Sequence, residues 1–177
     1  MSWQDKLRQV EPYVAGEQPK ISNMIKLNTN ENPYGPSNQV KEVLKEIDIE
    51  KLKLYPNSDG EELRHALADY HGLKDNQVFL GNGSDEVLAL TFLTFFNGKE
   101  PVLFPNISYS FYPVYCDLYQ MSYKEVLLDQ DFKINVEDFK QPNSGIIFPN
   151  PNAPTGVYMP LDQVECANRI TCFFRFY

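Results

Sequence analysis

The feature that most constrains this chain is a repeated alternation of short apolar segments with helix-like segments. Apolar runs at 77–80, 101–104, 123–128 and 145–148 have the length of strands, and helical patterns lie between them. Most of these runs are bounded by Gly, Pro or Asn, which favour turns. The alternation predicts an α/β fold, in which a mostly parallel sheet is flanked by helices.

Charge and cysteine content narrow the classes of function. The 177 residues include 16 Lys and Arg against 24 Asp and Glu, giving a formal net charge of −8. A chain this acidic is not expected to bind nucleic acid or an anionic membrane surface. The longest apolar run, 87–96, is too short to span a bilayer. The N-terminus lacks the apolar core of a signal peptide. The three cysteines have no metal-ligand spacing, so we expect a reduced, cytoplasmic protein with no metal site.

Two helices are expected before the first glycine-containing segment. Ser37 stands at the N-cap position of one helix. The apolar residues of this helix are expected to lie on one face: Val40, Val43, Leu44 and Ile47. Ser58 and Glu61 form a capping-box pattern for the next helix, and Gly72 is expected to end it. This second helix is expected to bury its apolar residues, which are Leu63, Ala66, Leu67 and Tyr70. Both histidines of the chain fall on this second helix, where we expect structural roles for them.

The segment 80–86 connects an expected strand to a helix. Gly81 and Gly83 permit close backbone approach, and Ser84 can cap the helix. The free N–H groups of a first helical turn, with the helix dipole, form a site for an anion such as phosphate. We expect the amides of Ser84 and Asp85 to bind the anion, with the Asp85 carboxylate turned aside. Taken alone, the segment also fits a tight turn without a ligand.

Two further segments follow expected strands. In 105–112, Tyr109 offers an aromatic ring that can stack on a flat heterocycle, although rim packing explains the residue equally well. In 150–156, two prolines restrict the backbone on either side of Asn152. A cis X-Pro bond here would aim the asparagine amide in one fixed direction. This rigid polar turn at a strand end is the most specific signal in the chain.

The three segments, in this order, resemble the fold-type-I pyridoxal-phosphate (PLP) aminotransferases. The Asn-Pro-Asn-x-Pro-Thr-Gly turn closely matches that superfamily. Residues 28–32, Tyr55-Pro56, 83–86 and the segment around Tyr109 resemble the histidinol-phosphate aminotransferase branch. The resemblance covers residues from about 25 to 165.

The resemblance implies a domain organisation as well as a fold. Residues 1–30 would form an N-terminal arm, and residues 31–165 an incomplete PLP-binding large domain, truncated before the Schiff-base lysine. Residues 166–177 contain two of the three cysteines and a run of aromatic residues. We interpret this tail as aberrant, the product of a frameshift or early stop, with a divergent but selected terminus as the alternative.

The resemblance also implies a role for each site residue. The amides of Ser84 and Asp85 would hold the PLP phosphate, and Tyr109 would stack on the pyridine ring. Tyr55 would reach across a homodimer interface to the phosphate of the neighbouring subunit's cofactor. Asn152 would donate to the PLP 3′-oxygen, because the position directly before the second proline of the turn is alanine here, where many relatives carry asparagine.

The reaction implied is transfer of an amino group between L-histidinol phosphate and 2-oxoglutarate, forming imidazole acetol phosphate and L-glutamate. In the family, the lysine, the acid at the pyridine nitrogen and the substrate arginines lie well after the Asn-Pro-Asn turn. We therefore expect no catalytic residue in this chain and no activity of the chain alone. Two other functions fit the residues. One is another PLP enzyme of this fold, such as an aromatic aminotransferase or a threonine-phosphate decarboxylase. The other is a non-catalytic module that binds a phosphate ligand.

Overall fold

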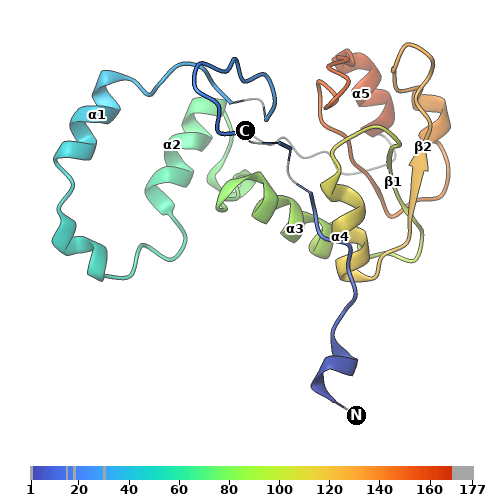
Figure 1. Ribbon diagram of the computed structural model, residues 1–177, viewed down its shortest axis with the longest axis horizontal. Coiled ribbons are helices and arrows are strands. Elements are labelled where there is room, and N and C mark those ends of the chain that lie inside the picture. The colour runs from blue at the N-terminus through green and yellow to red at the C-terminus, as the bar shows by residue number, and fades with distance from the viewer. Residues whose placement is uncertain (1, 15, 18, 30, 169–177) are drawn as a thin grey trace. The chain divides into compact units, whose positions relative to one another are not determined.

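The computed structural model of the chain describes residues 2–14, 16–17, 19–29 and 31–168 (Figure 1). It divides into two compact units. One, the helical unit, is Val14–Leu80. The other, the sheet unit, combines the residues up to Tyr13 with those from Gly81 onward. Of the atypical tail predicted from the sequence, residues 169–177 lie outside the described part of the chain.

The helical unit contains α1 (Asn38–Lys45), the 3₁₀ helix η2 (Ile49–Lys53), α2 (Glu61–His71) and the 3₁₀ helix η3 (Asp75–Gln77). The predicted cap of α1 is confirmed, because the Ser37 hydroxyl accepts a hydrogen bond from the amide of the third helical residue.

The two ends of α2 compare differently with the sequence prediction. Gly72 ends the helix in the left-handed conformation at φ 64°, as expected. The capping box predicted from Ser58 is wrong, since α2 begins one residue after Gly60, which has φ 59° and provides no side-chain cap. Because glycine reaches this left-handed conformation easily, the chain enters the helix by a backbone turn and does not use the serine.

The apolar face of α1 is formed but is not covered. Val43 is 65% exposed, and the other three residues of this face are also exposed. Within the described part of the helical unit, Ala68 is the one buried residue. The prediction that α2 buries its apolar residues is therefore wrong, since Leu63 and Tyr70 are exposed and the short helices of this unit bring no second layer against them.

The sheet unit contains a three-stranded parallel sheet in the order β2-β1-β3. Its strands are β1 (Val102–Pro105), β2 (Tyr123–Val126) and β3 (Gly145–Ile146). This confirms the predicted α/β class with a parallel sheet. The strand expected at 77–80 is not formed. Gln77 is the last residue of η3, and residues 78–80 form no regular secondary structure.

The sheet unit also contains three α-helices and two 3₁₀ helices. The α-helices are α3 (Gly83–Phe95), α4 (Phe111–Tyr119) and α5 (Leu161–Asn168), and the 3₁₀ helices are η1 (Trp3–Lys6) and η4 (Val136–Phe139).

Buried side chains of β1 alternate between two apolar clusters. Val102 and Phe104 pack with residues of α3 and α4, whereas Leu103 packs with Val126 and Phe139. β1 is thus covered on both faces, as is usual for the central strand of a parallel sheet.

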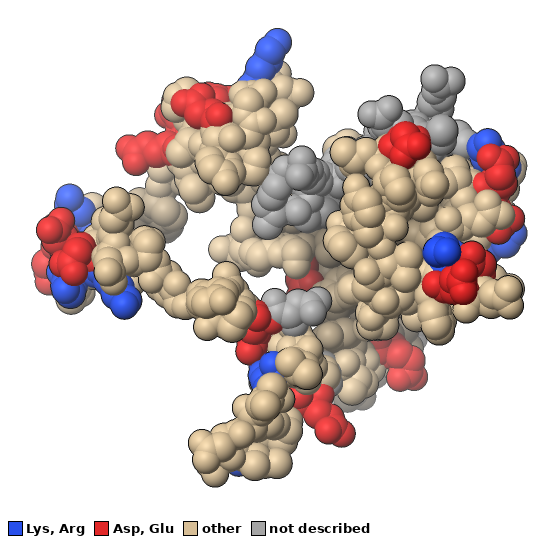
Figure 2. Space-filling model, turned by 90° about the horizontal axis from the view of Figure 1, so that it is seen from above, with Lys and Arg blue, Asp and Glu red and all other residues tan. Residues whose placement is uncertain are grey.

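Surface charge agrees with the acidic composition. On the face drawn in Figure 2, the described Lys and Arg side chains lie scattered among acidic ones and do not gather into one basic patch. Among the described residues, no helix is both long enough and apolar enough to cross a membrane.

Candidate functional site

The segments that follow β1 and β3 meet at one edge of the sheet. Because the two strands are parallel, their carboxyl ends lie at the same edge. The side chain of Asn152, after β3, accepts a hydrogen bond from the Ser108 hydroxyl at 3.0 Å and donates to the Ile107 carbonyl at 2.9 Å. The structure thus joins two of the three segments predicted from the sequence.

The turn after β3 has a fixed shape. The Asn150–Pro151 and Ala153–Pro154 peptide bonds are both cis, in line with the expectation for this segment. The Asn150 side chain makes two hydrogen bonds with the backbone of Met159, donating to its carbonyl and accepting from its amide, each at 2.9 Å. Asn152 lies inside the turn and is 2% exposed.

The third predicted segment forms the N-terminus of α3. The helix begins at Gly83 with Asn82 as N-cap, so Ser84 lies in the first turn and does not cap the helix. Gly83 has φ 80°, a conformation that favours glycine. Among the described residues, neither the Ser84 amide nor the Asp85 amide has a hydrogen-bond acceptor. Two N–H groups therefore point out of the helix end, where the helix dipole favours an anion.

Asp85 links this helix end to the aromatic segment after β1. Its carboxylate accepts a hydrogen bond from the Tyr109 hydroxyl at 2.6 Å, and its carbonyl accepts one from the Tyr115 hydroxyl at 3.0 Å. The carboxylate is thus engaged by a phenol, and the amide of the same residue stays without an acceptor. The ring of Tyr109 is held beside the first turn of α3.

The Tyr109 hydroxyl is a stable hydrogen-bond donor. Its pKa is raised above its ordinary value, first by burial and then by the hydrogen bond to Asp85 and the negative charge of that carboxylate. The pKa of Tyr115 is raised for a similar reason, burial followed by the charge of Asp85. Both phenols therefore stay protonated at neutral pH, and the contact between Tyr109 and Asp85 persists.

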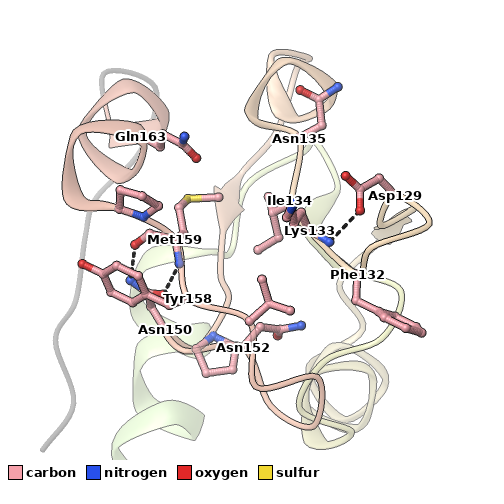
Figure 3. Close-up of a pocket in the computed structure, with 13 residues that line it drawn as sticks. Asp129, Phe132, Lys133, Ile134, Asn135, Asn150, Asn152, Tyr158, Met159 and Gln163 are labelled. Atoms are coloured by element: carbon pink, nitrogen blue, oxygen red, sulfur yellow. Dashed lines mark hydrogen bonds between the residues drawn. The ribbon is translucent and has the colours of Figure 1, made fainter.

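A cavity of about 640 Å³ opens beside the turn after β3 (Figure 3). It lies between the loop at 129–135, the turn itself and the start of α5. Ser84, Asp85 and Tyr109 do not line it. Of the residues that line it, the side chains of Asn150 and Asn152 are bonded within the protein. Of the predicted site residues, Asn152 lines this cavity, and the other predicted residues of the sheet unit do not.

Two further side chains complete the comparison with the sequence prediction. Tyr55 lies in the helical unit and is fully exposed there. His65, for which a structural role was expected, has its Nδ1 3.2 Å from a carboxylate oxygen of Asp75 and its Nε2 3.5 Å from one of Asp69. Within the described residues, no group of three or more His, Cys, Asp or Glu is placed to hold a metal ion.

The sequence matches the aminotransferase class I and II family over residues 22–170. The chain belongs to this family. It is 56% identical over 165 residues to the histidinol-phosphate aminotransferase of Lactococcus lactis subsp. cremoris strain SK11, a match that covers 93% of this chain and 46% of the relative. It is 55% identical over 163 residues to that of Pseudomonas putida strain KT2440, covering 92% of this chain and 47% of the relative. These relatives confirm the resemblance to the histidinol-phosphate aminotransferase branch.

The fold is also that of an aminotransferase. The crystal structure of a candidate histidinol-phosphate aminotransferase from Erwinia carotovora atroseptica SCRI1043 superposes with a TM-score of 0.72 at 23% identity. The superposition covers 86% of this chain and 46% of that one. The chain therefore spans about half the length of the aminotransferases it matches.

Class I and II aminotransferases are generally PLP enzymes, and the residues present here fit two parts of that cofactor. The two unpaired amides at the start of α3 suit a phosphate, and the ring of Tyr109 beside them suits a pyridine face. The fit is poorer at the third predicted contact, because both amide hydrogens of Asn152 already bond to the protein. The sequence did not predict the roles of Ser108 and Thr155. The Ser108 hydroxyl bonds to Asn152 from the segment after β1, and the Thr155 hydroxyl bonds to it from within the same turn.

Proposed function

We propose that this chain forms the phosphate-binding and ring-binding part of a PLP-dependent aminotransferase that acts on L-histidinol phosphate and 2-oxoglutarate. The observation that carries the proposal is the junction at Asp85. There, one residue leaves its amide without an acceptor and engages its carboxylate with the Tyr109 phenol. The choice of substrates is supported by 56% and 55% identity to two histidinol-phosphate aminotransferases.

Different residues bind different parts of the cofactor. Bound PLP supplies an electron sink for the carbon that exchanges its amino group. The amides of Ser84 and Asp85 bind the phosphate, and the dipole of α3 favours the negative charge there. Tyr109 covers one face of the ring and keeps water from it. Its bond to Asp85 sets the position of the ring and keeps the carboxylate from repelling the phosphate.

One part of the site is proposed from the family resemblance. In a homodimer, Tyr55 of one subunit contacts the phosphate bound by its partner, a role that suits its full exposure in the helical unit. The contact of Asn152 with the PLP 3′-oxygen, expected from the sequence, is not part of this proposal, because both amide hydrogens of Asn152 are bonded within the protein. A reducing compartment, the cytoplasm, suits the free and buried Cys116.

We further propose that the 177 residues alone bind PLP but do not turn over substrate. By the family resemblance, the lysine, the acid at the pyridine nitrogen and the substrate arginines follow the segments described here. The chain spans 46% of its Lactococcus relative, in line with a division of the whole enzyme's machinery between this part and the rest.

The proposal is tested by measuring the thermal shift of the purified chain with PLP and, in parallel, glutamate formation from L-histidinol phosphate and 2-oxoglutarate. We expect PLP to raise the melting temperature without turnover. Ser84→Pro removes one amide hydrogen at a helical position that tolerates proline, and is expected to abolish the shift. Ser84→Ala keeps the amide and is the matched control, with circular dichroism checking that both variants fold.

Three results would count against parts of this proposal. A shift that survives in Ser84→Pro places the phosphate elsewhere. Turnover by the chain alone contradicts the division of catalytic groups. A shift with inorganic phosphate as large as that with PLP favours a non-catalytic phosphate-binding module.

A further inference from the structure

The side chain of Asn152 is fully used inside the protein. Its Nδ2 donates to the Ile107 carbonyl at 2.9 Å and to the Thr155 hydroxyl at 3.1 Å, and its Oδ1 accepts from the Ser108 hydroxyl at 3.0 Å. A backbone carbonyl can only accept a hydrogen bond, so the contact with Ile107 fixes which end of the amide is the nitrogen. An asparagine amide has two hydrogens, and both are engaged.

The backbone of Asn152 is held as firmly as its side chain. Its N–H donates to the Val157 carbonyl at 2.9 Å, and its carbonyl accepts from the Gly156 amide at 2.7 Å. The residue is 2% exposed, so these bonds are shielded from competing water. Asn152 is therefore rigidly placed, and its amide is aimed back at the segment that follows β1.

That segment carries Tyr109, and it is anchored from two other directions. Asn106 bonds toward β2, since its amide donates to the Val126 carbonyl and its side chain accepts from the Leu128 amide, each at 2.9 Å. The hydroxyl of Tyr109 bonds to Asp85 on α3. Asn152 provides the connection on the β3 side, at the two residues directly before Tyr109.

We propose that Asn152 is a positioning residue, which joins the turn after β3 to the segment after β1 and so sets the place of the Tyr109 ring. This assigns the amide to the protein and not to the cofactor's 3′-oxygen. Opening either Nδ2 bond would remove the donor that Asn152, itself 2% exposed, gives to the oxygen of Ile107 or of Thr155. The inference deepens the proposed function and rests on it for the effect on PLP, but the coupling between the two segments stands without a ligand.

The test compares Asn152→Asp with Asn97→Asp in the 177-residue chain. Asn152→Asp keeps the shape of the side chain but turns both donors into acceptors that face the oxygens of Ile107 and Thr155. Asn97→Asp makes the same chemical change at an exposed position of the sheet unit. Without ligand, Asn152→Asp is expected to shift the NMR resonances of the Ile107–Ser108 amides and of the Tyr109 ring, and Asn97→Asp to leave them in place.

Binding separates a positioning role from a general loss of structure. Asn152→Asp is expected to lower the affinity for PLP about tenfold, because the displaced Tyr109 ring no longer stacks on the PLP ring. The affinity for inorganic phosphate, which needs only the amides of Ser84 and Asp85, is expected to stay within about twofold. Tyr109→Ala is expected to lower PLP affinity similarly, and the double variant to lose little more, because both changes remove the same ring contact.

The outcomes decide the two claims separately. Unchanged resonances at Ile107–Tyr109 in Asn152→Asp, or equal losses of PLP and phosphate affinity, overturn the positioning role. If the unaltered chain binds neither ligand, the proposed function fails, whereas the ligand-free resonances still decide the inference. If Asn152→Asp does not fold, Ser108→Ala removes only the bond to Oδ1. It is expected to shift the Tyr109 ring resonances to a smaller extent, and their remaining unchanged would overturn the inference.

Discussion

At the scale of single residues, the site depends on hydrogen bonds between distant parts of the sequence. The sequence singled out Ser84, Asp85, Tyr109 and Asn152 because each follows an expected strand and has suitable chemistry. It did not predict the bond between Asp85 and Tyr109, which are 24 positions apart, or that between Ser108 and Asn152, which are 44 apart. Such partners depend on how the strands pair, and local sequence patterns carry no information on that.

Removing the Tyr109 hydroxyl is expected to weaken PLP binding although the ring remains. In Tyr109→Phe, the Asp85 carboxylate loses its donor at 2.6 Å and is free to turn toward the unpaired amides, where it competes with the phosphate. We expect the dissociation constant for PLP, measured by fluorescence titration, to rise about 3- to 10-fold. Tyr158→Phe, at an exposed tyrosine, is the control.

Asp85→Asn is the complementary change. The asparagine oxygen still accepts from Tyr109, and the negative charge beside the phosphate is gone. The affinity for PLP is therefore expected to equal or exceed that of the unaltered chain in the same titration. A Tyr109→Phe variant that binds PLP unchanged, or an Asp85→Asn variant that binds it more weakly, contradicts the role given to this bond.

His65 gives the helical unit a pH dependence. Its pKa is raised from 6.5, first by the hydrogen bond to Asp75 and then by the charge of Asp69. A group whose pKa is raised on folding stabilises the folded state fully below its unfolded pKa, and this contribution is lost as pH rises through the folded pKa. NMR titration of the His65 ring is expected to give a midpoint above 6.5. His65→Gln is expected to remove the corresponding part of the stability change, and a midpoint at or below the ordinary value would contradict the ion-pair geometry.

At the scale of elements, apolar runs predicted strands correctly where the segment pairs with a neighbouring strand. The runs at 101–104 and 123–128 became β1 and β2, which pair in parallel from Val102 and Tyr123 onward. The run at 77–80 has similar composition but pairs with no strand among the described residues, and it forms no strand itself. Pairing is a tertiary property, and β-forming residues alone do not decide it.

Gly145 allows β3 to lie close against Phe96. A Cβ at this position would lie 2.3 Å from the Phe96 ring, which is itself buried in the core. Gly145→Ala is therefore expected to lower the free energy of unfolding by about 1–3 kcal/mol, measured in urea. Gly35→Ala, where an added Cβ meets no atom within 4 Å, is the control and is expected to change stability little. Equal stabilities of the two variants would contradict the packing of β3 against Phe96.

At the scale of the whole molecule, the sequence predicted the class of fold but misjudged burial. The helix predicted at α2 is formed, yet Leu63 and Tyr70, which it was expected to bury, are exposed, because burial requires a second surface that the helix itself does not specify. The chain also spans only about half the length of its aminotransferase relatives.

The two units are expected to differ in local stability. Among its described residues the helical unit buries only Ala68, whereas β1 is covered by apolar clusters on both faces. Backbone segments with few buried contacts open more readily than core strands. Hydrogen exchange followed by mass spectrometry is expected to show fast exchange in α1 and slow exchange in β1. Equal protection of the two would contradict the burial seen here.

The central claim is that the first turn of α3 and the ring of Tyr109 together hold PLP, and NMR titration of the labelled chain with PLP tests it most directly. The account predicts that the largest shifts fall on the Ser84 and Asp85 amides and on the Tyr109 ring, with the Asn152 side-chain amide unchanged. Largest shifts at residues that line the cavity beside the turn, such as Tyr158 and Gln163, or no shifts at any residue, would contradict it.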